Sequence, residues 1–375
     1  MTKEELFLIQ ILSDFINKKG QTELVDGLNL QYLFDFGKKH EVLGIIYHQT
    51  KQEQFFKSYA STIYLNMYRN NMVEQLISKF EFPYFIVKGL EVAKFYPNPI
   101  LRTMGDIDFV VHEDDMEKAH EIFINQGYEN ITKSDKHEWR YCKDNLEFEL
   151  HNRLVYSESV NNLKQDSFFM NVWPFVKENK LDWNYHFLYL ISHLRRHFMN
   201  SGVGLRQFMD IAIVAKYVDL DWKWIENKAK NIEMLSFTKN VLAFCKRWFE
   251  ISIPIDIPEL EDEFYEYSTQ KILKDGLFGF GNEENKFSPG VNAYRVSGTK
   301  GMIRLLFNHI FPSYKILCEV PCYSFVRGKK FLVPFAWIYR LFRKKDVSYL
   351  KEINKKYAKK SQIKERENMY KQWGL

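Results

Sequence analysis

Two aspartates in strict alternation with apolar residues constrain the fold of this chain more than any other feature. Residues 105–111 read Gly-Asp-Ile-Asp-Phe-Val-Val. Because side chains alternate between the two faces of a β-strand, this pattern predicts a strand with Asp106 and Asp108 on one face. Side chains two positions apart on a strand begin roughly 6.5 to 7 Å apart, so both carboxylates can reach one divalent cation. The segment therefore predicts a strand that carries a metal site.

A second alternating segment, residues 146–151, supplies a third acid. Its apolar residues share one face of the predicted strand, whereas Glu147, Glu149 and His151 share the other. If this strand pairs beside residues 105–111, Glu149 joins the two aspartates. Glu147 lies on the same face and could exchange roles with Glu149. His151 either orients a carboxylate or meets the substrate, or it is a structural hydrogen-bonding residue.

A phosphate-binding turn is predicted between a strand over residues 82–87 and a short helix over residues 90–95. A glycine at such a junction exposes backbone N–H groups where the helix dipole favours anions, and Gly89 has this place. Lys88 ends the apolar strand, and it is either a phosphate contact or a surface cation. Arg102, shortly before the aspartate strand, is a second cation for the phosphates.

Helical periodicity surrounds this central region, so the predicted fold class is α+β: a small mixed sheet flanked by helices. We predict a helical lead-in over residues 1–80, an α/β core over 81–155, a helical domain over 156–330 and a basic amphipathic tail over 331–375. Within the core, residues 128–132 and 138–142 are further predicted strands. The other predicted helices are residues 113–126, 181–199, 203–218, 222–230, 235–249, 300–311, 335–342 and 347–370, with an irregular loop over 278–292.

Composition limits the class of protein. Of the 375 residues, 46% are hydrophobic and 17% aromatic, which is enough for a sizeable core and argues against wholesale disorder. Four scattered cysteines do not make a disulfide framework, and this favours a reduced, cytoplasmic setting. No segment has the roughly 20 apolar residues that a membrane-spanning helix needs, so no transmembrane segment is expected.

Positive charge is concentrated near the C-terminus. Residues 340–366 contain 11 Lys or Arg against 3 acids, whereas the whole chain has a net charge of +5. This basic tail is either a solvated terminal helix or a weak contact for an anionic surface such as a membrane or a nucleic acid. A peripheral membrane protein that uses residues 331–345 is a third interpretation of the chain.

Two pairs at helical spacing in the helical domain also carry polar groups. His193 and His197 have a spacing that zinc sites use, but no Glu follows His193, and the two arginines between the histidines disfavour a bound cation. Arg206 and Asp210 most simply form an ion pair along one helix. The functional alternative is that Arg206 faces a bound ligand from the helical domain.

The motifs together resemble the uncharacterised nucleotidyltransferase branch of the polymerase β superfamily. The resemblance covers about residues 40 to 345, and its motifs are specific in combination. They are Lys88-Gly89-x-x-x-Ala93-x-x-Tyr96-Pro97, Arg102-x-x-Gly105-Asp106-Ile107-Asp108, Gly127-Tyr128, Glu149-Leu150-His151, and the helical segment with His193 and Leu205-Arg206-x-x-x-Asp210.

The resemblance implies a minimal nucleotidyltransferase fold that binds Mg²⁺, with Mn²⁺ as a substitute, and a nucleoside triphosphate such as ATP. The implied enzyme moves a nucleoside monophosphate to a hydroxyl acceptor and releases pyrophosphate. A small molecule, a glycan, a protein and tRNA all stay open as the acceptor. The implied site consists of Asp106, Asp108 and Glu149 as catalytic metal ligands, Lys88, Gly89, Arg102 and Gly105 at the nucleotide, and His151, Glu147 and Arg206 as accessory residues.

The chain departs from the family pattern in two places. Members usually carry Gly-Ser or Gly-Gly after the first strand, whereas here Lys88-Gly89 is followed by Leu90, so a serine contact to phosphate is missing. The third acid in this branch is often Asp, and Glu149 reaches one methylene further. The missing serine motivates an alternative: a nucleotide-binding regulator or toxin–antitoxin component with the same fold and little or no transferase activity.

Overall fold

The computed structural model describes residues 1–132, 138–155, 163–277, 300, 304, 307–308, 310–319, 321–343 and 360–375. The loop predicted over residues 278–292 lies outside them, as do residues 347–359 of the helix predicted over 347–370 and half of the helix predicted over 300–311. The chain divides into two units. The first holds Met1–Phe198, Gly202–Phe280 and the last two residues, and the second holds Met199–Ser201 and Gly281–Trp373.

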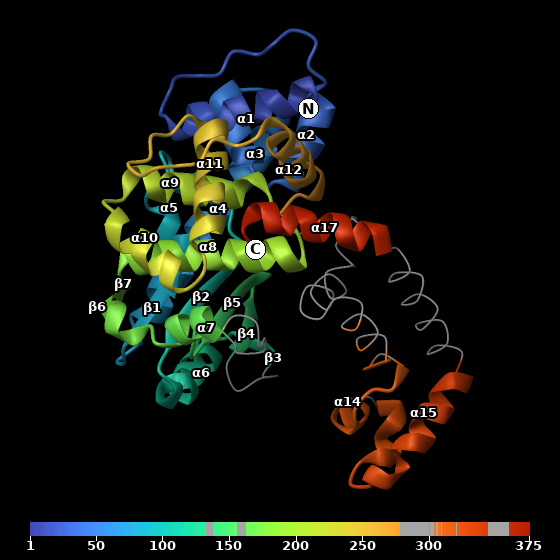
Figure 1. Ribbon diagram of the computed structural model, residues 1–375. Coiled ribbons are helices and arrows are strands. Elements are labelled where there is room, and N and C mark those ends of the chain that lie inside the picture. The colour runs from blue at the N-terminus through green and yellow to red at the C-terminus, as the bar shows by residue number, and fades with distance from the viewer. Residues whose placement is uncertain are drawn as a thin grey trace. The chain divides into compact units, whose positions relative to one another are not determined.

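The predicted lead-in is helical, and four α-helices form it. They are α1 (Lys3–Ile16), α2 (Leu30–Lys39), α3 (Leu43–Thr50) and α4 (Phe56–Ile77). The first begins at a capping box, in which the Thr2 hydroxyl accepts the Glu5 N–H and the Glu5 carboxylate accepts the Thr2 N–H. In Figure 1 the lead-in helices are blue to teal.

A mixed five-stranded sheet follows, which confirms the predicted α+β class. The strands are β1 (Tyr84–Val87), β2 (Asp106–Val111), β3 (Glu129–Thr132), β4 (Glu138–Lys143) and β5 (Leu146–His151), in the spatial order β1-β2-β5-β4-β3. Only the β2–β5 pair among them is parallel. Asp144 and Asn145, both with positive φ, form the tight turn between β4 and β5.

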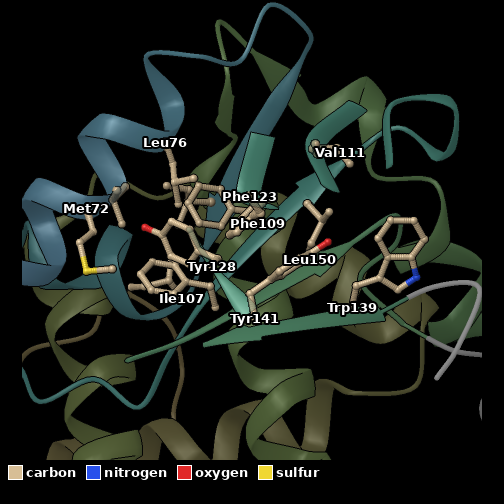
Figure 2. Close-up of a cluster of buried hydrophobic side chains, with 14 of the residues drawn as sticks. Met72, Leu76, Ile107, Phe109, Val111, Phe123, Tyr128, Trp139, Tyr141 and Leu150 are labelled. Carbon is tan, nitrogen blue, oxygen red and sulfur yellow. The ribbon is translucent and has the colours of Figure 1, made fainter. Parts of the chain in front are cut away.

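One face of this sheet carries a hydrophobic core. Phe109 of β2 and Phe148 of β5 point into it, together with Tyr141 of β4. Helices α4 and α6 (Met116–Asn125) close it, and Figure 2 shows Leu76 and Phe123 entering from these two helices. Because β2 and β5 bury their apolar side chains here, their intervening residues must face the opposite side of the sheet.

Helices cover that opposite face. They are α8 (Trp183–Asn200) and α9 (Leu205–Tyr217), and Figure 1 shows α8 on the side of the strands away from α6. Helix α5 (Gly89–Ala93) follows β1, and the short helix η2 (Pro99–Leu101) precedes β2. The first unit is completed by α7 (Leu163–Met170), η5 (Trp173–Phe175), the hairpin β6 (Val176–Lys177) and β7 (Lys180–Leu181), α10 (Trp222–Asn231), α11 (Leu235–Phe249) and α12 (Asp262–Asp275). Helices α7 and α12 were not predicted from the sequence.

The second unit contains α14 (Tyr314–Glu319), η7 (Pro321–Val326), η8 (Lys330–Leu332), α15 (Val333–Phe342) and α17 (Lys360–Trp373). It has a small core of its own around Leu317, Tyr323 and Ala336. Among the described residues, no helix is both long and apolar enough to cross a membrane.

A buried ion pair fastens the sheet region to α9. Arg102 Nε donates to Asp210 Oδ1 at 2.9 Å, and Arg102 Nη2 donates to Asp210 Oδ2 at 2.7 Å. The Tyr96 hydroxyl donates to the same carboxylate at 2.7 Å. The predicted ion pair between Arg206 and Asp210 is wrong, because Asp210 is turned to Arg102 while Arg206 pairs with Glu41 at 3.2 Å.

We expect Asp210→Asn to lower the free energy of unfolding by about 3 kcal/mol, since the substitution leaves the Arg102 guanidinium buried without its counter-charge. Urea denaturation measures the change. The matched control is Glu233→Gln, which breaks the exposed pair between Lys164 and Glu233 and should cost less than about 0.5 kcal/mol. Equal effects of the two substitutions would contradict this role of the buried pair.

Buried His40 predicts a loss of stability in mild acid. Burial lowers the pKa of His40 to about 3, and His40 Nδ1 accepts the Leu205 N–H at 3.2 Å, which a ring protonated at that atom cannot do. In the unfolded chain the ring takes up a proton near pH 6.5. The stability that the folded protein gains from the neutral ring is therefore complete above that pH and is lost as the pH falls toward 3. Denaturant titrations at several pH values measure how the free energy of unfolding changes with pH. We expect His40→Asn to reduce this change by up to about 1.4 kcal/mol per pH unit. An unchanged slope would argue against it.

Candidate active site

Parallel pairing of β2 with β5 brings the predicted acids to one face of the sheet. In its register Asp106 lies opposite Glu147, and Asp108 lies opposite Glu149. Asp108 and Glu149 are buried, whereas Glu147 is exposed at the rim. Of the two glutamates on β5, Glu149 is thus the one enclosed with the aspartates.

These acids line a pocket of about 450 Å³ on the face opposite the hydrophobic core. Its lining residues come from the sheet strands, which we call its floor, from Lys88 and Gly89 between β1 and α5, and from α8 and α9, which we call its wall. Its lining includes all the predicted metal and nucleotide residues: Lys88, Gly89, Arg102, Gly105, Asp106, Asp108 and Glu149. Glu147 and Arg206 also line it, while His151 contacts the acids from the end of β5.

Cations already neutralise the two buried acids. Lys88 Nζ contacts Asp108 Oδ1 at 2.5 Å, and His151 Nε2 lies 3.3 Å from Asp108 and 3.2 Å from Glu149. Arg140 Nε adds a contact to Glu149 at 3.1 Å. Each buried carboxylate therefore has two basic partners.

The pKa values follow from this arrangement. Burial alone would raise the pKa of Asp108, but Lys88 and His151 hold it below its usual range. Burial would likewise lower the pKa of His151, but hydrogen bonds to Asp108 and Glu149 raise it to about 9, so the ring is a cation at neutral pH. Asp106 differs, because burial and the neighbouring Asp108 raise its pKa. Its charge is the least compensated of the three.

The side chains of Asp108, Glu149 and His151 can together offer ligands to a metal ion. One ligand atom from each lies within 4.8 Å of the other two. Asp106 is outside this set, although it lines the same pocket. Two carboxylates and an imidazole suit Mn²⁺ once the His151 ring has lost its proton, and the carboxylates with Asp106 suit Mg²⁺, which prefers oxygen. Lys88, His151 and Arg140 now neutralise the acids, as a divalent ion would do if it were bound.

Backbone strain marks the turn between β1 and α5. Lys88 has φ 59° and ψ −121°, an unusual conformation for a residue with a side chain. Its N–H donates to His186 Nε2 at 2.9 Å, and burial lowers the pKa of His186 to about 3, so the ring stays a neutral acceptor. A Cβ at Gly89 would lie 3.0 Å from Arg102 Nη1. At Gly105 it would meet nothing within 4 Å.

The predicted phosphate-binding cations differ in availability. Arg102 is buried, and its Nε and Nη2 atoms both donate to Asp210 of α9. In the structure it therefore positions α9 and is not free to turn toward a phosphate without breaking this pair. Arg206 lines the pocket while it pairs with Glu41 and donates to the Thr103 carbonyl oxygen. Lys88 is turned toward Asp108.

Sequence reasoning missed two histidines of the pocket wall. His193 and His197 face the acids from α8, and their Nε2 atoms lie 2.9 Å apart. Burial lowers the pKa of His193 well below its usual range and that of His197 to about 4, so both rings are neutral. Their helical spacing was visible in the sequence, but only a zinc site was considered for it. Arg140 of β4 was missed as well.

Comparison with known proteins bears on the same region. A family model described as uncharacterised nucleotidyltransferase matches residues 27–250, more than half of the chain. This range contains the five-stranded sheet, α8 and α9, and it ends before Gly281, where the main part of the second unit begins. No curated protein and no solved structure gives a significant match. The chain belongs to this family of uncharacterised nucleotidyltransferases.

Proposed function

We propose that the chain is a divalent-metal-dependent enzyme that moves a nucleoside monophosphate from a nucleoside triphosphate to a hydroxyl acceptor. The observation that carries this proposal is the buried row of acids on adjacent parallel strands, facing a 450 Å³ pocket with basic side chains at its rim. Such a pocket has the size of a small ligand and the charge pattern that a metal–triphosphate complex requires.

Asp106, Asp108 and Glu149 would hold the metal, with His151 beside them. When bound, Mg²⁺ or Mn²⁺ supplies positive charge for the triphosphate and lowers the pKa of the attacking hydroxyl. The donor set fits this role, because two of its carboxylates are kept ionised by basic neighbours in the protein itself. A third, Asp106, is exposed to the pocket with little compensation.

The transfer forms one bond and breaks one. The acceptor oxygen attacks the α-phosphorus, the bond from this phosphorus to the bridging oxygen of the β-phosphate breaks, and pyrophosphate leaves with that oxygen. The acceptor proton passes to a carboxylate. Glu149 takes this proton or completes the metal site.

Basic and neutral donors then hold the phosphates. Lys88 is close enough to exchange its contact with Asp108 for one with a phosphate oxygen, and Arg206 approaches from α9. His193 and His197 line the pocket as neutral rings, so they add polar surface beside the phosphates without adding charge. Gly89 keeps the backbone open beside these groups.

The acceptor class is left open by the pocket itself, and a small molecule, a glycan, a protein or tRNA would each present a hydroxyl. We place the reaction in the cytoplasm, because all four cysteines are free thiols.

A second candidate function has its own support. A nucleotide-binding regulator or toxin–antitoxin component with this fold would keep the pocket but not turn over. The buried contact of Lys88 with Asp108, together with Leu90 in the place of a phosphate-binding serine, favours this alternative. Nucleotide binding without release of pyrophosphate across a broad set of acceptors would establish it.

Asp106→Asn is the direct test of the enzymatic proposal, because Asp106 forms no ion pair with any residue that the structure describes. We expect label transfer from each of four labelled triphosphates, incubated with a cell extract and Mg²⁺ or Mn²⁺, to fall by about 10²-fold or more. Chelation of the metal should have the same effect. The matched control is Asp114→Asn, an exposed aspartate that is not among the residues lining the pocket, which should keep nearly full activity. Unchanged, metal-independent transfer by Asp106→Asn would refute the assignment.

Lys88→Met separates a phosphate contact from a purely structural cation. Loss of a charged hydrogen bond should weaken triphosphate binding by about ten- to a hundredfold. Removal of the cation next to Asp108 should at the same time strengthen the binding of Mn²⁺ alone. The control is Lys94→Met, which removes an exposed lysine at the end of α5. Calorimetry measures both affinities, and a variant that binds triphosphate like the wild type would contradict the phosphate role.

A further inference from the structure

Helix α15 of the second unit is apolar on two faces. One face packs within the unit, where Val333, Ala336 and Trp337 join the small core around Leu317 and Tyr323. The Trp337 indole N–H also donates to the Pro312 carbonyl oxygen at 2.9 Å. This face accounts for the folding of the helix against its own neighbours.

The other face has large apolar side chains and little cover. We call it the aromatic stripe, and its exposed fractions are 62% for Phe335, 55% for Ile338 and 80% for Phe342. Phe331, just before the helix, is 72% exposed, and Tyr339 is 49% exposed. Positions 331, 335, 338, 339 and 342 follow helical spacing, so the five side chains form one continuous surface. An apolar surface of this kind usually marks an interaction site.

The sequence that carries the stripe is strongly positive. Residues 320–345 contain seven Lys or Arg and no Asp or Glu. Lys329 and Lys330 are exposed directly before Phe331. A contact between two copies of this stripe would bring like charges together, so the charge disfavours a second copy as the occupant.

We propose that the aromatic stripe docks on an anionic lipid surface. Phenylalanine, isoleucine and tyrosine side chains flanked by lysine and arginine are what helices at a membrane interface present. The ten-residue helix is about 15 Å long, half the thickness of a bilayer core, so it lies along the surface instead of crossing it. None of these residues lines the carboxylate pocket, and the inference therefore stands apart from the proposed reaction.

Co-sedimentation of the full chain with vesicles tests the proposal. We expect binding to vesicles that contain phosphatidylglycerol and at least about tenfold weaker binding to pure phosphatidylcholine vesicles. Phe335→Ser with Phe342→Ser should reduce binding to the anionic vesicles by about tenfold or more. The matched control is Tyr64→Ser with Met67→Ser, since these two side chains on α4 are 68% and 62% exposed but lie away from any such cationic run.

Lys329→Glu with Lys330→Glu is a second variant that does not alter apolar packing. It should weaken binding to anionic vesicles about tenfold or more at low salt, and the difference should shrink as salt is raised. Absence of binding to anionic vesicles, or binding that neither variant pair changes, would overturn the proposal. So would light scattering that shows a dimer dissociated by the Phe335 and Phe342 substitutions, because a second copy would then be the occupant.

Discussion

The parallel pairing of β2 with β5 is the constraint on which the pocket depends. It places Glu149 opposite Asp108 although 41 positions separate them in the chain, and it does so while both strands bury their alternate residues in the core. A shift of one residue in this register would turn the acids into the core and the aromatic residues into the pocket. The core and the acid row therefore specify each other.

Burial of the acids has an electrostatic cost that the surrounding basic groups offset. An isolated carboxylate as buried as Asp108 would tend to protonate, since a low-dielectric site disfavours its charge. Lys88 and His151 reverse this tendency, and their own charges are stabilised by the same carboxylates. The cluster is thus mutually dependent, and the strained backbone of Lys88 is part of what holds its ammonium group there. When a metal–triphosphate complex binds, the metal would take the place of Lys88 and His151 beside the carboxylates, and the phosphates would offer these cations new partners.

The floor of this site could be predicted from sequence, but its wall could not. Alternation within six residues is a local pattern, so it predicted the shared face of Asp106 and Asp108 and the face of Glu149 within its own strand. That the two strands pair was a condition that the pattern did not supply. The Arg102–Asp210 pair joins residues 108 positions apart, and a helical spacing suggested the nearer partner Arg206 instead. Local spacing favours local partners, whereas a buried guanidinium pairs with whichever carboxylate the tertiary fold encloses with it.

The same limit explains the missed elements and histidines. Helix α12 buries Ser268 and Thr269 along with Phe264 and Ile272, so polar residues interrupt its apolar stripe and hide the helical period. His193 and His197 show their period clearly, but only the position of α8 above the acid row gives that face a function.

Helix α15 presents the reverse case, in which the sequence pattern is strong but does not separate two apolar faces. Val333 and Trp337 look no more apolar in sequence than Phe335 and Phe342, yet the first two pack in a core and the other two are exposed. Because a contiguous exposed apolar surface of this kind marks an interaction site, the exposed side of α15 is expected to bind a partner. Apolar burial is non-directional, so it does not distinguish one apolar partner from another. The positive charge of residues 320–345 does, because it favours an anionic partner.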